Sequence, residues 1–163
     1  GQPPVSPAPG GELPFTPPAD RIWGFVTWFD PGSGFPPDLT LPSAPPSALV
    51  MLARFRPGEV RAASAAVSVR PCRHSAGTIM TSECAYVLDR GLAAWTDDVE
   101  LVAWADMDSD GIVDQGDLLL RMTARDRDGR PIPPGTPPEL LHFFGLIFMR
   151  KDVYTGPPLR VVR

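Results

Sequence analysis

Twelve consecutive residues, from Asp106 to Asp117, constrain this chain more than any other stretch of it. They read Asp-Met-Asp-Ser-Asp-Gly-Ile-Val-Asp-Gln-Gly-Asp, with carboxylates at positions 1, 3, 5, 9 and 12 and a glycine at position 6. Ca²⁺ binds about six to eight oxygens at roughly 2.3–2.6 Å, and alternate side chains at the start of a tight loop supply them. The spacing therefore predicts a calcium loop.

The predicted ligands are the side chains of Asp106, Asp108, Asp110, Asp114 and Asp117 and the backbone carbonyl of Ile112. Asp114 binds directly or through a water, and Asp117 closes the site, ideally with both oxygens. Gly111 permits the sharp reversal that aims the Ile112 carbonyl at the ion, while Val113 turns outward into apolar surroundings. The alternative is a solvated acidic turn. The chain has a net charge of −4 and this loop alone carries five carboxylates, whose mutual repulsion favours a bound cation.

The segments on both sides of the loop resemble strands rather than helices. Residues 98–105 are short and rich in β-branched and aromatic residues. Residues 118–123 fit either a helix or a strand, and a turn follows at 126–129. We therefore expect the loop to connect two strands, with the ion ordering a loop that is otherwise not compact.

The twelve-residue loop resembles that of EF-hands and, more closely, that of dockerins. Dockerins also place aspartate at position 12 and follow it with leucines, as Asp117-Leu118-Leu119-Leu120 does here. The resemblance implies flanking helices and a second copy of the loop, and this sequence contains no second loop. A dockerin-like adaptor, in which residues 106–122 dock a partner protein, is the alternative function that this resemblance leaves open.

Apolar runs recur along the chain between turns rich in proline and glycine. The predicted strands are Ile22–Phe29, Ala48–Phe55, Val60–Val69, Cys84–Leu88, Val99–Ala105, Leu118–Ala124 and His142–Arg150. A hairpin turn is expected at 56–59 and a long loop at 30–46. Strands at this spacing predict an all-β fold, a single antiparallel β-sandwich, in one domain over residues 21–163.

The order of these parts resembles bacterial secreted and lipoprotein domains with a prealbumin-like or carbohydrate-binding-like sandwich. The motifs are Gly24-Phe25-Val26-Thr27, Ala48-Leu49-Val50-Met51-Leu52-Ala53, and a strand that ends in the loop, Ala103-Trp104-Ala105-Asp106-Met107-Asp108-Ser109-Asp110-Gly111. The Pro-Gly-x-Tyr turn that usually precedes the last motif is missing here. The resemblance implies a secreted or surface-attached module with a protein or carbohydrate partner.

Residues 1–20 contain seven prolines and three glycines and almost no apolar periodicity. Proline at this density favours extended polyproline II, so we expect a disordered tether. A proline-rich spacer before a folded domain is the arrangement of surface lipoproteins, in which a lipid anchor lies upstream of Gly1.

Cys72 and Cys84 are the two cysteines of the chain. Their spacing does not fit a Cys-x-x-Cys motif, and their even number predicts a disulfide and an extracytoplasmic location. Two free buried thiols are the alternative. The acidic balance of the chain makes nucleic acid an unsuitable partner, and its longest apolar run, residues 140–149, is about half of a membrane span.

Catalytic motifs are missing around the two histidines, His74 and His142. We therefore expect no enzymatic activity. A hydrolase that uses carboxylates near Asp97, Asp98 and Asp106 is the competing interpretation.

The four tryptophans offer a sugar-stacking platform as the alternative to core packing. Trp23 and Trp28 are five residues apart on one predicted strand, so their side chains point to opposite faces. Core packing is expected for most of the tryptophans, and Trp95, beside a predicted turn, is the candidate for an exposed ligand contact.

Overall fold

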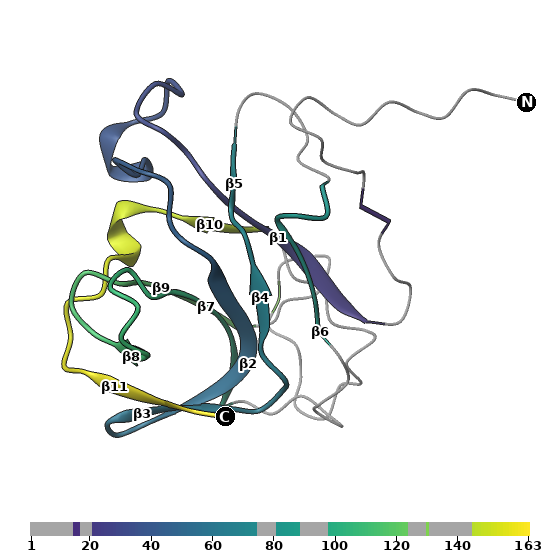
Figure 1. Ribbon diagram of the computed structural model, residues 1–163, viewed down its shortest axis with the longest axis vertical. Helices are drawn as coiled ribbons and strands as arrows, with labels where there is room; N and C mark the ends of the chain where they lie inside the picture. Colours follow the sequence, from purple (N-terminus) through teal and green to yellow (C-terminus); the bar gives the residue numbers. More distant parts are fainter. Residues whose placement is uncertain (1–14, 17–20, 75–80, 89–97, 124–129, 131–144) are drawn as a thin grey trace, which may run out of the picture.

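The computed structural model describes residues 15–16, 21–74, 81–88, 98–123, 130 and 145–163, which form an all-β fold (Figure 1). The strands are β1 (Ile22–Trp28), β2 (Ala48–Arg56), β3 (Glu59–Ala62), β4 (Val67–Val69), β5 (Cys72–Arg73), β6 (Ala85–Leu88), β7 (Val99–Ala105), β8 (Ile112–Val113), β9 (Leu118–Met122), β10 (Leu146–Phe148) and β11 (Leu159–Val162). The described residues also form the short 3₁₀ helices η1 (Pro37–Leu39), between β1 and β2, and η3 (Arg150–Asp152), between β10 and β11. No helix of the described residues is long and apolar enough to cross a membrane.

Two sheets pack against each other. In the smaller sheet the order is β10-β1-β5, with β6 also paired to β1, and in the larger sheet it is β8-β11-β3-β2-β7-β9, with β4 also paired to β2. Their facing side chains form the first hydrophobic cluster, which includes Val26 and Phe148 from the smaller sheet and Val50, Leu101 and Ala103 from the larger. This is the core of a β-sandwich.

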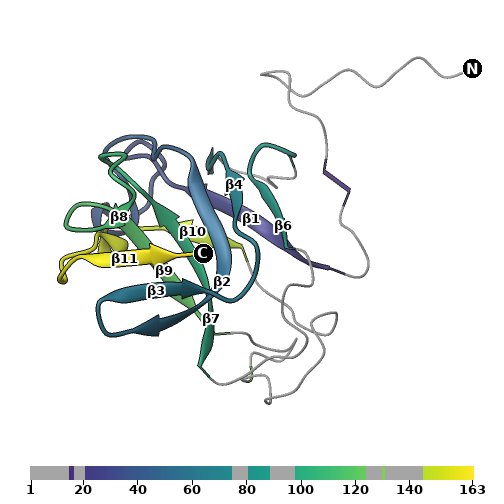
Figure 2. The ribbon, with the colours of Figure 1, turned by 60° about the horizontal axis from the view of Figure 1, so that its bottom comes forward.

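The larger sheet is curled, as Figure 2 shows. It also has a second hydrophobic cluster of its own. Successive side chains of a strand point to opposite faces, so β2 and β7 bury both of their faces. Met51, Val102 and Trp104 enter the second cluster, where Val60 and Val113 cover them from β3 and β8. An isolated bridge links Leu118, the first residue of β9, to Val153, in the segment between η3 and β11.

Most of the predicted strands are confirmed. β7 begins and ends as predicted, and the hairpin turn at 56–59 joins β2 to β3 in antiparallel register. The predicted strand His142–Arg150 is confirmed only as β10, because residues 142–144 lie outside the described residues and Arg150 begins η3. The strands β5, β8 and β11 were not predicted.

The predicted strand Val60–Val69 is interrupted by a bulge. The amides of Ala63 and Ser64 both donate to the carbonyl of Leu52, at 2.7 and 3.2 Å. The hydroxyl of Ser64 accepts the amide of Leu52 at 2.9 Å. Four residues, 63–66, lie opposite two residues of β2, Met51 and Leu52, so pairing with β2 stops after β3 and resumes at β4.

The prediction that the sandwich is antiparallel is wrong, because the sheets are mixed. β1 pairs in parallel with β5 and with β10, and β3 pairs in parallel with β11. A parallel pair needs a long connection, and each of these pairs joins strands that are far apart in the sequence. Turn residues indicate pairing only between strands that are consecutive in the sequence, so these parallel pairings have no local signal in the sequence.

Candidate metal centre

The acidic loop connects two adjacent strands at one end of the larger sheet. It leaves β7 at Ala105 and enters β9 at Leu118, and these two residues face each other in the antiparallel pair β7–β9. The prediction of a strand-to-strand connection is therefore confirmed. The helix that a dockerin-like unit needs after its loop is replaced here by β9.

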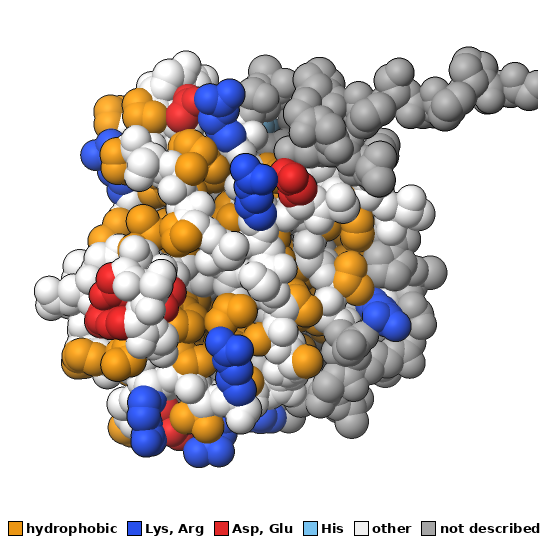
Figure 3. Space-filling model, viewed as in Figure 1, with side chains coloured by type: hydrophobic (Ala, Val, Ile, Leu, Met, Phe, Trp, Pro, Cys, Tyr) orange, Lys and Arg blue, Asp and Glu red, His pale blue; other side chains and the backbone are white. Residues whose placement is uncertain are grey.

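Four carboxylates of the loop converge. Each of Asp106, Asp108, Asp110 and Asp117 offers an oxygen, and these oxygens all lie within 4.8 Å of one another. Oxygens on opposite sides of a cation at roughly 2.3–2.6 Å are about 4.6–5.2 Å apart, so the group has the size of a first coordination shell. Figure 3 shows the acidic side chains gathered at the edge of one face, where Figure 1 places β8.

Hydrogen bonds inside the loop fix its tight winding. The amide of Gly111 donates to Oδ2 of Asp106 at 2.8 Å, and the amide of Asp110 reaches its Oδ1 at 3.3 Å. The amide of Ile112 donates to Oδ1 of Asp110 at 3.0 Å. Gly111 has a φ of +78°, a left-handed conformation that a residue without Cβ adopts without strain. The reversal predicted at this glycine is confirmed.

Asp117, the last residue of the loop, is 1% exposed and is held by three donors. Its Oδ1 accepts the amide of Met107 at 2.9 Å, and its Oδ2 accepts the amide of Asp114 at 3.2 Å. The third donor is the indole Nε1 of Trp104, at 3.0 Å from Oδ2. A buried carboxylate is stable only when such partners replace its water, so Asp117 is ordered by the protein itself.

Sequence reasoning assigned Trp104 to the core and missed its contact with the loop. The side chain is 3% exposed and packs in the second cluster. A buried indole N–H normally finds an acceptor, and the nearest acidic residues in sequence are those of the loop. That requirement is the signal that could have identified Trp104.

Asp114 lies beside the four converging carboxylates rather than among them. Its hydrogen bond to Asp110 raises the pKa of Asp114 to about 7, with further contributions from burial and from the charges of Asp108, Asp110 and Asp117. Its Oδ1 is buried and has no hydrogen-bond partner among the described residues. An orphaned carboxylate oxygen next to a group of carboxylates fits a site that holds a cation.

The pKa values of the neighbouring aspartates separate in the same way. A hydrogen bond with Asp106 raises the pKa of Asp108, whereas the backbone hydrogen bond from Ile112 lowers the pKa of Asp110. Without a cation to offset their charge, the aspartates of the loop therefore differ in how readily they bind a proton.

The C-terminal segment binds the loop at two places. β8, inside the loop, pairs in antiparallel register with β11, where Val113 faces Leu159. Near the end of the loop, the amide of Gly116 donates to the carbonyl of Tyr154 at 3.1 Å, and the amide of Tyr154 donates to the carbonyl of Asp117 at 2.8 Å. Val113 is 1% exposed within the second cluster, so its predicted apolar surroundings are confirmed.

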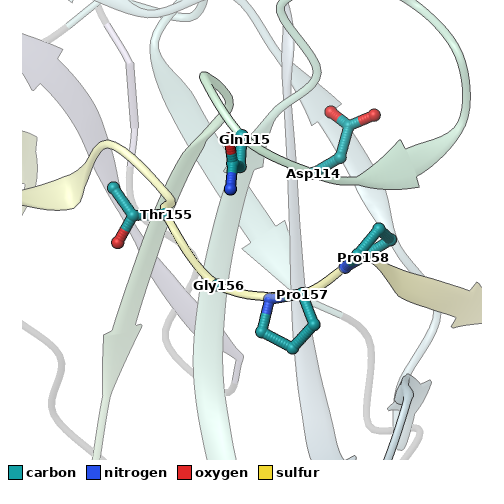
Figure 4. Close-up of a pocket in the computed structure, with 6 residues that line it drawn as sticks. All are labelled: Asp114, Gln115, Thr155, Gly156, Pro157 and Pro158. Atoms are coloured by element: carbon teal, nitrogen blue, oxygen red, sulfur yellow. The ribbon is translucent and has the colours of Figure 1, made fainter.

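A shallow pocket of about 420 Å³ lies between the loop and this segment. Its lining residues are Asp114, Gln115, Thr155, Gly156, Pro157 and Pro158 (Figure 4). The carboxylate of Asp114 points away from the residues 155–158, toward its own loop. The pocket therefore has few converging polar groups, and we assign it no ligand.

Cys72 and Cys84 lie at disulfide distance, with 5.3 Å between their Cα atoms. They connect the short strand β5 to the residue that precedes β6.

Of the carboxylates named for a hydrolase, the two that the structure describes, Asp98 and Asp106, lie at opposite ends of β7. Asp98 precedes β7 and forms ion pairs with Arg54 and Arg56, at 3.1 and 2.8 Å. Asp106 follows β7 at its other end, roughly 25 Å away for an extended strand. Asp97 lies outside the described residues.

The remaining predicted residues are scattered. Trp23 is half-buried and Trp28 buried on opposite faces of β1, as expected. His74 stacks on Phe29, with ring centroids 4.8 Å apart. Trp95 and His142 lie outside the described residues.

Comparison of the chain with protein-family models, with curated proteins and with solved structures finds no match.

Proposed function

We propose that this chain is a calcium-stabilised β-sandwich module of a secreted or surface-attached protein, and that it serves as a structural or binding component without enzymatic activity. The observation that carries the proposal is the convergence of four aspartates at the junction of two core strands. The order of the sequence motifs supports a protein or a carbohydrate as the partner class.

The donor set favours calcium over other metals. All candidate ligands are oxygens, whereas zinc prefers nitrogen and sulfur. Magnesium demands a near-ideal octahedron and keeps several waters, while calcium accepts many carboxylates in a flexible arrangement. Asp106, Asp108, Asp110 and Asp117 would hold the ion, with the Ile112 carbonyl and Asp114 completing the shell. The ion would supply positive charge that offsets the repulsion among these carboxylates.

The attachments of the loop favour a structural role for the ion over a sensor role. A calcium sensor opens a pair of helices on binding, whereas this loop lies between β7 and β9 and is paired to β11. Such a loop has little room to move while the strands remain paired. The cysteine pair at disulfide distance supports an oxidising, extracytoplasmic compartment.

Calorimetry of chelator-treated protein tests the proposal. We expect one site for Ca²⁺ and much weaker binding of Mg²⁺. At a hundredfold excess of Ca²⁺ over its Kd, the free energy of unfolding should rise by about 2.7 kcal/mol, with the circular dichroism spectrum unchanged.

Asp108→Asn removes one exposed carboxylate with little change in shape and should weaken binding at least tenfold. The matched control is Asp38→Ala, which removes an exposed carboxylate of η1, away from the loop. Absence of binding heat at millimolar Ca²⁺ in folded protein would contradict the proposal, and a calcium-induced rise in helix content would favour the dockerin-like adaptor.

A further inference from the structure

The outer face of β1 carries two aromatic side chains that the first cluster does not use. Ile22 and Val26 point into the core, and Gly24 between them lies against Tyr86 of β6. A Cβ at Gly24 would stand 2.5 Å from the hydroxyl oxygen of Tyr86, so the tyrosine ring fills this place on the inner face. Trp23 and Phe25 therefore face outward, half-buried, with ring centroids 6.0 Å apart and planes at 81°.

A third ring, from the segment that precedes β1, lies on this pair. The centroid of Phe15 is 6.0 Å from that of Trp23 and 5.5 Å from that of Phe25, the latter in an edge-to-face arrangement at 83°. All three separations fall within the range of about 4.5–7 Å that attractive aromatic pairs prefer. We call Phe15, Trp23 and Phe25 the aromatic triad.

Phe15 belongs to the proline-rich segment that precedes the folded domain. Its neighbours in sequence are Leu13-Pro14 and Thr16-Pro17-Pro18, which carry no charge. Proline-rich segments bind aromatic surfaces readily because polyproline II is extended beforehand and loses little entropy on docking. Trp23 and Phe25 provide such a surface. Its occupant, Phe15, is an aromatic side chain with prolines on both sides in the sequence.

We propose that Trp23 and Phe25 form a docking site for a proline-flanked aromatic side chain, and that the chain fills this site with its own Phe15. The segment is thereby anchored at Phe15, six residues before the domain begins at Arg21. A free peptide of the same chemistry competes with a covalently linked one, whose effective concentration is on the order of millimolar. The site therefore accepts a segment from another molecule only when Phe15 is displaced.

The test uses the full chain, its Phe15→Ala variant and a peptide of residues 10–19. In two-dimensional NMR spectra, Phe15→Ala should shift the indole N–H signal of Trp23, and the peptide should shift it back. The peptide should bind Phe15→Ala roughly tenfold or more tightly than the unaltered chain, because the linked segment no longer competes. A peptide with alanine in place of phenylalanine should not bind.

Two variants control for non-specific effects. Phe35→Ala removes another exposed ring, which lies on Phe29 at 4.1 Å, and should leave the Trp23 signal and peptide binding unchanged. Trp23→Leu in the Phe15→Ala background keeps an apolar side chain but removes the ring, and should abolish binding. An unshifted Trp23 signal in Phe15→Ala, or equal peptide binding with and without Trp23, would overturn the proposal.

Discussion

The two hydrophobic clusters share β2 and β7 but are closed in different ways. The first cluster lies between two sheets, and strands cover it on both sides. The second lies inside the curl of one sheet, where Trp104 and Val113 connect it directly to the acidic loop. The first cluster meets the loop at its two ends, through Ala105 and Leu118, whereas the second contains the loop residue Val113 and Trp104, which binds the loop. We therefore expect the order of the second cluster to depend more strongly on how well the loop is held.

The largest expected effect is a loss of stability in the first cluster that does not depend on calcium. Phe148 is fully buried in that cluster, and Phe148→Ala should lower the free energy of unfolding by about 3–5 kcal/mol. Because Phe148 lies on β10 of the smaller sheet, whereas the loop joins β7 to β9 of the larger sheet, we expect the loss to be the same with calcium and with chelator. Urea unfolding under both conditions measures it. Losses that differ between the two conditions would mean that the clusters behave as one.

A smaller effect is expected from the indole that joins the second cluster to the loop. Trp104→Phe keeps an aromatic ring in place but deletes the N–H that binds Asp117. Groups that orient a metal ligand typically change metal affinity by roughly tenfold to a hundredfold, so calcium affinity should fall by about tenfold in a calorimetric titration.

The matched control is Trp28→Phe, a buried tryptophan of the first cluster, which should lower stability without changing calcium affinity. Equal affinities in Trp104→Phe and the unaltered chain would show that the backbone amides of Met107 and Asp114 are enough to hold Asp117.

The smallest effect is a pH dependence confined to the loop. The folded, metal-free protein raises the pKa of Asp114 from 3.8 to about 7. Between these values the folded protein binds more protons than the unfolded chain, so its stability should fall as the pH rises from about 4 to about 7. Calcium competes with this proton, so calcium affinity should instead rise with pH through about 7.

Thermal unfolding with chelator and calcium titrations at about pH 6 and pH 8 measure both trends. Asp114→Asn removes one group with a raised pKa and should weaken both trends, whereas Asp38→Ala should leave both unchanged. A calcium affinity that falls with rising pH would contradict the assignment.

The sequence predicts local features of this protein better than distant ones. The loop spacing placed four carboxylates correctly at one point, and β-branched and aromatic residues identified β7 to the residue. The parallel pairs were not predicted, because no sequence pattern indicates that β3 pairs with β11. The bulge at Ser64 depends on a hydrogen bond between its side chain and the opposite strand. Hydrophobic periodicity does not predict such a bond.

The curl of the larger sheet also has a consequence for the order of folding. Glu59 and Arg160, which face each other in β3 and β11, are 101 residues apart in sequence, whereas the loop joins β7 to β9 within a single short connection. A longer chain between two paired strands adds little to the free-energy cost of bringing them together, but it slows the pairing. The acidic loop is therefore in a position to form first and to present β8 as an edge on which β11 aligns. Calcium would then act on the rate at which the curl closes as well as on its final stability.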